Sequence, residues 1–292
     1  YFDENEVNLL NLPSDTSTSA EELTSKEGNY KIKLSEIYSG YFDEKVVKSS
    51  VTNLNNGDEV VYIDKDGNEI QCIVLYDSSN TYGVQIITLN TISNVTLGMN
   101  DTSPNAEGNK GSATRARWSF NNAIDTLNAY AEAYRLENLS DIASAARCVG
   151  SIPNNPSSRN TEKFYPDDNM YRINSRWDDN YKDKYESDDS NYTEDITKMN
   201  TLGIAKSNNN NPYWLPSREI SWGDDGQGET YVNFNVRSID STGSLSKSVL
   251  VRVSDSYGEI QRENRSYGVR PVFTLDSSSH YIVENGTKKL VE

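Results

Sequence analysis

The sequence has only one histidine, His280, and two cysteines, Cys72 and Cys148. A Ser–His–Asp triad or a histidine-rich metal site would depend on that single histidine, and no G-x-S-x-G, C-x-x-C or H-E-x-x-H motif accompanies it. The chain also lacks the glycine-rich patterns that bind phosphates and dinucleotides. These absences favour a protein that is not an enzyme and that carries no cofactor, no catalytic residues and no metal.

Positive charge and apolar residues are scarce as well. The 292 residues include 28 Lys and Arg against 44 Asp and Glu, which gives a net charge of −16, and 35% of the residues are apolar. Binding to nucleic acid or to an anionic membrane needs a basic surface. No stretch approaches the roughly 20 apolar residues of a membrane-spanning helix. We therefore expect no nucleic-acid partner and no membrane contact by this fragment.

Two features leave alternatives open. The acidic run at 178–189 could supply oxygen ligands for Ca²⁺, but it lacks the spacing of a calcium-binding loop, and a solvated charged loop is the ordinary explanation. In an exported protein Cys72 and Cys148 could form one disulfide; otherwise they would be buried free thiols.

The order of predicted elements indicates an α+β fold. Residues 1–46 are polar and rich in Ser, Thr and Glu, which is typical of a linker, and the folded domain is expected over 47–292. Short Val/Ile/Tyr runs separated by Asp-Gly and Ser-Asn turns predict three antiparallel strands within 57–89. Strands, then helices, then strands again fit an antiparallel sheet segregated from its helices rather than alternating βαβ units.

Three helices are expected in the middle of the chain. Apolar residues recur at helical spacing over 118–139. A second helix is predicted over 139–150, ending at a glycine, and a third over 191–204 with Thr193 as its N-cap. The remainder of the chain, from residue 213, is predicted to be strand and turn.

The block at 213–275 is the most informative part of the sequence. Over 231–237 polar and apolar residues alternate strictly, so Val232, Phe234 and Val236 should face one side of a sheet. Over 248–254 the same pattern, broken at Leu250, places the valines inward and Ser248, Arg252 and Ser254 outward. The block is rich in Ser, Tyr, Arg and Asn, as recognition surfaces are, although the solvated face of an ordinary antiparallel sheet uses the same residues.

Three stretches of this block carry a family resemblance: "YWLPSR" at 213–218, "NFNVRSIDSTGSLS" at 233–246 and "SYGVRPVFTL" at 266–275. Together they resemble the C-terminal module of C-type-lectin-fold variable proteins of the diversity-generating-retroelement type, which are pilin-like or surface proteins of gut Firmicutes. Weaker matches upstream extend the resemblance over about 50–275. The departures are Pro216, where the family usually has Ala, and the acidic insertion "WGDDGQGE" that begins at Trp222.

The resemblance implies a C-type lectin-like fold whose face at about 219–267 is a variable recognition site, for a ligand that we expect to be a protein. Fixed scaffold positions would be Trp214, Arg218, Gly268, Arg270 and Pro271. The implied ligand-binding positions are Ser221, Trp222, Tyr231, Asn233, Asn235, Arg237, Ser238, Asp240, Lys247, Arg252, Ser254, Asp255, Tyr257, Glu259, Arg262, Arg265 and Tyr267. The strand alternation independently selects Tyr231, Asn233, Asn235 and Arg237.

The resemblance also implies an extracellular or cell-surface location, with an N-terminal anchor removed upstream of Tyr1. The alternatives are a minor pilin or adhesive subunit, with pilus or surface-assembly partners, and, ranked last, a lectin-fold enzyme.

The motif at 266–275 carries three expectations of its own. Pro271 cannot donate a ladder hydrogen bond, which places it at a sheet edge or bulge. Gly268 permits close packing that a side chain would block. Arg270 is expected to be a structural hydrogen-bonding hub, with ligand contact as the alternative.

Overall fold

The computed structural model describes residues 6–8, 31–33, 47–101, 112–138, 142–150, 189–224, 230–254 and 258–291. The chain divides into two compact units, Tyr1–Lys48 and Ser49–Glu292. In the first unit, β1 (Glu6–Asn8) pairs antiparallel with β2 (Lys31–Lys33). Within the described ranges, no helix is long and apolar enough to cross a membrane.

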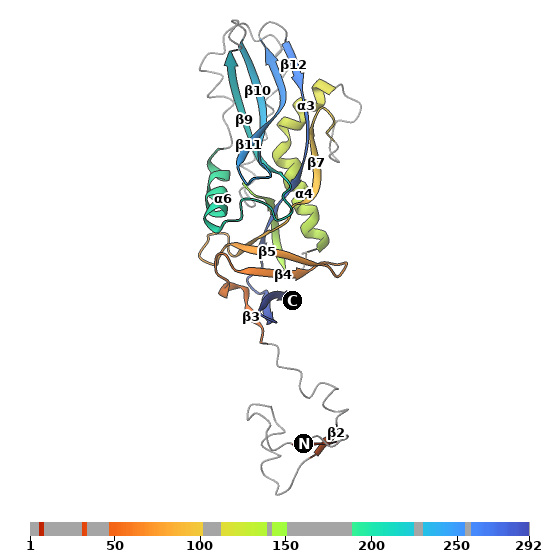
Figure 1. Ribbon diagram of the computed structural model, residues 1–292, viewed down its shortest axis with the longest axis vertical. Coiled ribbons are helices and arrows are strands. Elements are labelled where there is room, and N and C mark those ends of the chain that lie inside the picture. The colour runs from red at the N-terminus through yellow and green to blue at the C-terminus, as the bar shows by residue number, and fades with distance from the viewer. Residues whose placement is uncertain are drawn as a thin grey trace. The chain divides into compact units, whose positions relative to one another are not determined.

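The second unit is mixed α+β, and its described strands form two sheets (Figure 1). The eight-stranded sheet has the order β3-β15-β16-β4-β5-β6-β14-β8. Its strands are β3 (Ser49–Ser50), β4 (Glu59–Ile63), β5 (Glu69–Tyr76), β6 (Gln85–Thr88), β8 (Ala143–Cys148), β14 (Pro271–Leu275), β15 (His280–Glu284) and β16 (Thr287–Val291). A short 3-10 helix, Val51–Asn53, follows β3. The three antiparallel strands predicted within 57–89 are confirmed as β4, β5 and β6.

The six-stranded sheet has the order β12-β11-β10-β9-β13-β7. Its strands are β7 (Ile92–Gly98), β9 (Tyr213–Asp224), β10 (Thr230–Ile239), β11 (Leu245–Ser254), β12 (Gly258–Arg262) and β13 (Asn264–Val269). All neighbours pair antiparallel except β13 and β9, which run parallel where Gly268 meets Tyr213. The long strands β9, β10 and β11 therefore lie side by side, with β10 in the middle.

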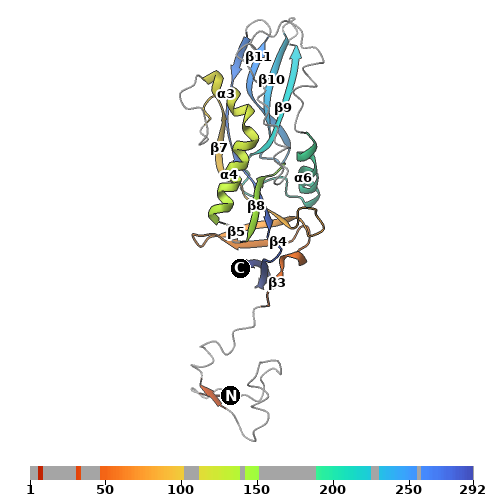
Figure 2. The same cartoon turned by 180° about the vertical axis from the view of Figure 1, so that it is seen from behind.

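Helices cover both faces of this sheet (Figures 1 and 2). On one face, α3 (Ser112–Asn121) and α4 (Ala123–Asn138) bury Phe120 and Leu127 against Val232, Phe234 and Val236. The Phe120 and Phe234 rings meet edge to face with centroids 5.2 Å apart, a preferred aromatic geometry. On the opposite face, α6 (Asp189–Leu202) packs Met199 against Tyr213, Leu215 and Ile239.

Two helix predictions were wrong in detail. The predicted helix at 139–150 is instead strand β8, which pairs antiparallel with β14. The alanine-rich run favours a helix locally, but pairing with a strand more than a hundred residues later overrides that preference. The α6 helix begins at Asp189, so Thr193 lies inside it and is not its N-cap. The helical periodicity over 118–139 was correct, and the structure divides it at Asn122 into α3 and α4.

The motif at 266–275 carries the chain from one sheet to the other. Strand β13 ends at Val269, β14 begins at Pro271, and Arg270 lies between them. Because β14 lies between β6 and β8, the expected edge position of Pro271 was wrong; it is the first residue of an inner strand, another place where proline is tolerated. At Gly268, an added Cβ would lie 2.4 Å from the Cβ of Thr91, so close packing excludes a side chain there.

Arg270 is fully buried at this crossing. Its Nε donates to the carbonyl oxygen of Thr88 (3.0 Å), and its Nη1 donates to the carbonyl of Ile204 (2.8 Å) and to the Tyr213 hydroxyl (3.3 Å). The guanidinium also lies 5.0 Å from the centroid of the Tyr213 ring. This geometry agrees with the structural hub and not with a ligand contact.

The two cysteines are free and fully buried, and they belong to different hydrophobic clusters. Cys148 donates through its thiol to the carbonyl of Leu127 (3.1 Å). Burial raises the pKa of both thiols, which removes the reactive thiolate at neutral pH.

Replacing Gly268 with Ala should destabilise the fold by about 1–3 kcal/mol, because the new methyl group overlaps Thr91 and the strand must shift. Urea denaturation measures this loss. Ser266→Ala is the control, since Ser266 is exposed on the same strand and should change the free energy of unfolding by less than about 0.5 kcal/mol. Equal stability of the two variants would contradict the packing argument.

Neither Cys72 nor Cys148 should react with Ellman's reagent in the native protein. After denaturation without reductant, two thiols per chain should titrate, because the cysteines are separate and reduced. Fewer than two thiols in the denatured, unreduced protein would show that a disulfide forms after all.

Candidate functional site

One face of the β9-β10-β11 sheet carries seven of the seventeen predicted ligand-binding residues. On β10 the alternate residues Val232, Phe234 and Val236 pack against α3 and α4, so the residues between them point to the opposite side. Cross-strand pairing brings the matching residues of β9 and β11 beside them. We call this surface the polar face. It consists of Glu219, Ser221, Gly223, Tyr231, Asn233, Asn235, Arg237, Lys247, Val249 and Arg252.

At one end of the polar face, Arg252 is held by two neighbours on β10. Its Nε donates to the Oδ1 of Asn233 (2.7 Å), and its guanidinium carbon lies 4.5 Å from the centroid of the Tyr231 ring. Gly223, directly opposite Tyr231 on β9, leaves room for that ring: a Cβ on Gly223 would lie 2.5 Å from the Tyr231 hydroxyl oxygen. Tyr231, Asn233 and Arg252 all remain partly exposed.

At the other end, charged side chains gather around Glu219. Its carboxylate pairs with Arg237 (Nη2 to Oε2, 3.2 Å) and with Lys247. Arg237 also donates through Nη1 to the Ser217 hydroxyl (2.8 Å) and to the Arg218 carbonyl (3.1 Å).

A bulge in β9 explains why Arg237 is held so firmly. Val236 pairs with Arg218 and Ser238 with Trp214, so three residues of β9, including Pro216, oppose Arg237 alone. A bulge interrupts the ladder, and the Arg237 guanidinium supplies a donor to the Arg218 carbonyl there. Its side chain is only 6% exposed. The prediction that Arg237 lies on this face was correct, but its expected availability to a ligand was wrong.

Asn235 and Ser238 correct the prediction in the same way. Asn235 lies on the polar face but is fully buried, and its Nδ2 donates to the Ser221 hydroxyl (3.1 Å). Ser238 is 2% exposed and opposite Trp214, on the side of the sheet that faces α3 and α4. Neither side chain is open to a ligand.

A second bulge reverses the predicted pattern on the part of β11 that precedes Leu250. Phe234 pairs with Val251 and Asn235 with Val249, which leaves Leu250 as an extra residue. Leu250 and Val251 are both buried in the core. Because a one-residue shift exchanges the two faces, Val249 lies on the polar face. Ser248 is buried on the helix-covered side instead, so its predicted outward position was wrong.

Tyr267, Asp240 and Arg265 lie away from the polar face. The Tyr267 ring packs on Trp214 with centroids 4.6 Å apart, which makes it part of the core contacts. Asp240 closes the β10–β11 turn, and the hydrogen bond from the Thr242 hydroxyl is the main cause that lowers its pKa. Arg265 is exposed on β13 and pairs with Glu263 (2.7 Å).

Several expectations fall outside the described residues. Asp255 and Tyr257 are not described at all. For four other predicted residues only the backbone is described: Trp222 on β9, Ser254 on β11, and Glu259 and Arg262 on β12. The acidic run at 178–188 is also outside. In the parts of the chain that are described, no three His, Cys, Asp or Glu residues are placed to hold a metal ion.

Two scaffold candidates on β9 contact the helix-covered side. Trp214 is fully buried and donates through Nε1 to the Val95 carbonyl (2.8 Å). Arg218 is 2% exposed and donates to the Asn121 carbonyl at the end of α3 (3.0 Å). Both side chains therefore anchor β9 from behind the polar face.

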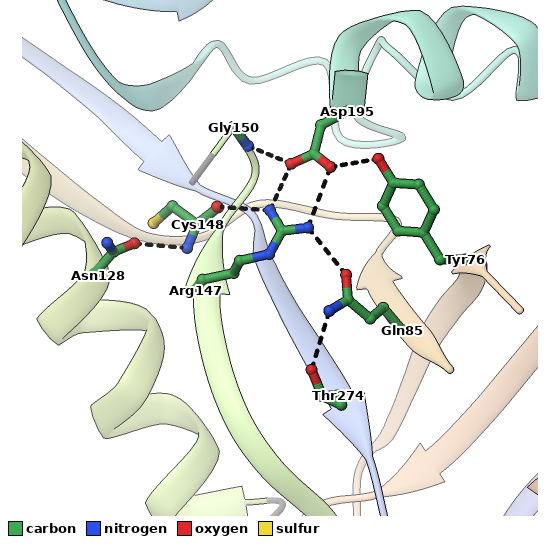
Figure 3. Close-up of polar contacts among 8 residues, drawn as sticks. All are labelled: Tyr76, Gln85, Asn128, Arg147, Cys148, Gly150, Asp195 and Thr274. Carbon is green, nitrogen blue, oxygen red and sulfur yellow. Dashed lines mark hydrogen bonds and ion pairs between the residues drawn. The ribbon is translucent and has the colours of Figure 1, made fainter. Parts of the chain in front are cut away.

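The sequence did not reveal a buried ion pair between Arg147 on β8 and Asp195 on α6 (Figure 3). The two side chains are 6% and 4% exposed. Both terminal nitrogens of Arg147 bond the Asp195 carboxylate, and its Nη2 also donates to the Gln85 Oε1 (3.0 Å). No motif marks two residues 48 positions apart, one of them in a segment predicted to be helical, so no local signal could have found the pair.

Asp195 collects further donors. The Tyr76 hydroxyl donates to its Oδ1 (2.7 Å), and the Gly150 amide donates to its Oδ2 (Figure 3). Burial, and secondarily the Asp195 charge, raises the pKa of Tyr76, which keeps its hydroxyl protonated as a donor. The carboxylate is thus occupied from three sides, and its role is to fasten α6 to β5 and β8.

Asp195→Asn should lower the free energy of unfolding by about 3–5 kcal/mol, because it leaves the Arg147 charge buried without its partner. Arg147→Met combined with Asp195→Leu should cost less than Asp195→Asn alone, since both charges are then removed together. The control is Asp66→Asn, in the exposed Lys65–Asp66 pair, which should cost less than about 1 kcal/mol. Urea denaturation of the four proteins tests the pair, and equal losses for Asp195→Asn and Asp66→Asn would contradict it.

No protein-family model matches this chain, and no curated protein and no solved structure is significantly similar to it. Its function must therefore be argued from the residues and their geometry.

Proposed function

We propose that this chain is a cell-surface or extracellular binding protein whose polar face recognises a protein ligand. The proposal assigns the chain a C-type lectin-like fold and no catalytic role. The observation that carries it is the convergence of Tyr231, Asn233, Lys247 and Arg252 on one side of two adjacent strands, β10 and β11. All four side chains keep exposed surface.

The residue types on the polar face support protein recognition. Tyrosine and arginine are the residues that most often dominate protein–protein binding energy. Tyrosine offers a large contact area with few rotatable bonds, and serine and asparagine add adaptable hydrogen bonds. On the polar face these residues stand on strands, so little conformational entropy remains to be lost on binding.

The division of the six-stranded sheet into two differently used sides also supports the proposal. Trp214 and Arg218, from the first family-like motif, are buried on the helix-covered side. Arg270, from the last motif, is buried at the crossing between the sheets. The polar face lies on the strands between these motifs, where the family resemblance implies variable positions.

The double variant Tyr231→Ala/Arg252→Ala should lose ligand binding while its melting temperature stays nearly that of the wild type, because substitutions of partly exposed side chains cost little stability. Proteins retained by the immobilised wild-type chain from a cell-surface fraction would be identified by mass spectrometry. Each retained protein would then be purified and titrated by calorimetry against the wild-type chain and against the double variant.

The matched control is Tyr82→Ala/Lys65→Ala, which removes an exposed tyrosine and an exposed cation far from the polar face in the sequence. It should keep wild-type affinity for every ligand. Retained binding by Tyr231→Ala/Arg252→Ala, or its unfolding, would contradict a recognition role for the polar face.

A further inference from the structure

The Arg252 guanidinium is fixed on one side and open on the other. Asn233 accepts from its Nε, and the guanidinium carbon lies over the Tyr231 ring, 4.5 Å from its centroid. Among the described residues, Nη1 and Nη2 have no hydrogen-bond partner, and Arg252 is partly exposed. The side chain is therefore oriented by its neighbours, but the edge that carries its two terminal nitrogens is unused.

This geometry selects a particular ligand group. Two parallel N–H donors on a planar guanidinium match the two oxygens of a carboxylate, and such bidentate pairs are among the strongest hydrogen bonds in proteins. Because Asn233 and Tyr231 already fix the guanidinium, less side-chain entropy is lost when the carboxylate binds. Gly223 contributes by leaving the space in which the Tyr231 ring lies.

Among the described charged side chains of the polar face, cations outnumber carboxylates. The whole chain carries a net charge of −16, yet the described polar-face side chains include three cations, Arg237, Lys247 and Arg252, and one carboxylate, Glu219. Glu219 is shared by Arg237 and Lys247, and Arg252 has no acidic partner among the described residues. A ligand carboxylate would therefore displace no acidic partner of Arg252 among the described residues.

We propose that the polar face recognises an acidic segment of its protein ligand. The two terminal nitrogens of Arg252, which we call the Arg252 fork, then bind one of the segment's carboxylates. This inference rests on the proposed function and adds the chemistry of the partner. Lys247 on β11 lies opposite Arg237 on β10, and Arg252 lies opposite Asn233. Arg237 and Asn233 are four residues apart along β10. That separation is about 13 Å in an extended strand, so a second carboxylate four residues along an extended peptide would reach Lys247.

Fluorescence anisotropy with a dye-labelled hexaglutamate peptide tests the inference on the full chain. Hexaglutamate should bind, and hexaglutamine carrying the same dye should not. Arg252→Lys keeps the charge but loses the fork, so it should weaken hexaglutamate binding by about tenfold or more. Arg265→Lys is the matched control, because Arg265 is an exposed arginine on β13 away from the polar face; it should bind as the wild type does.

Gly223→Ala provides a second, independent variant. Its methyl group would push the Tyr231 ring aside and release the Arg252 guanidinium, so hexaglutamate binding should weaken several-fold at an unchanged melting temperature. Unchanged binding by both Arg252→Lys and Gly223→Ala would overturn the inference. Tighter binding of a phosphoserine hexapeptide than of hexaglutamate would assign the fork to phosphate and overturn it as well.

The outcomes also separate this inference from the proposed function. If hexaglutamate does not bind but protein ligands are still lost by Tyr231→Ala/Arg252→Ala, then carboxylate recognition is wrong and the recognition role stands. If no ligand of any kind depends on Tyr231 or Arg252, both fail together.

Discussion

The structure depends on satisfying one buried cation, the Arg270 guanidinium, at the point where the chain leaves the six-stranded sheet and enters the eight-stranded one. Moving a cation from water into a protein interior costs roughly several kcal/mol, even after the protein relaxes. A buried guanidinium is therefore stable only where well-placed hydrogen-bond acceptors surround it. Its three acceptors come from separate parts of the chain: Thr88 at the end of β6, Ile204 after α6, and Tyr213 at the start of β9. The Tyr213 hydroxyl in turn donates to the Ala205 carbonyl. The hydrogen bonds of Arg270 therefore fix the position of the start of β9. The position of β9 in turn determines the register of the strands that form the polar face.

The α6 helix explains why the polar face occupies only part of its side of the sheet. Where α6 packs, the residues on that side are apolar: Tyr213, Leu215 and Ile239 belong to the same buried cluster as Met199. The buried pair of Arg147 and Asp195 fixes the helix there. Beyond the bulge in β9 the same side becomes polar, beginning with Ser217 and Glu219. One side of one sheet is thus core at one end and a candidate recognition surface at the other.

Local patterns in the sequence predicted those features that local chemistry decides. The turn residues and apolar runs gave β4, β5 and β6, and the alternation over 231–237 identified the two sides of β10. Features that depend on distant pairing were not predictable in this way. The alanine-rich β8 becomes a strand only because β14 pairs with it, and the bulge at Leu250 exists only in the register with β10. The ion pair of Arg147 and Asp195 requires both β8 and α6 to be in place before the two residues meet.

The candidate site shows the same limit more sharply. Alternation predicts on which side of a sheet a residue lies, but it does not predict whether that residue is buried or exposed. Tyr231, Asn233, Asn235 and Arg237 share one side, yet the last two are buried and the first two are partly exposed. The difference follows from their distance from the β9 bulge, where Arg237 is required to satisfy backbone groups. Residues near that bulge are committed to the fold: Arg237 bonds Ser217, the Arg218 carbonyl and Glu219, and the Asn235 amide nitrogen bonds Ser221. At the far end of the strands, around Gly223, Tyr231 and Arg252, the side chains of Tyr231 and Arg252 keep exposed surface, and that is where we propose that recognition occurs.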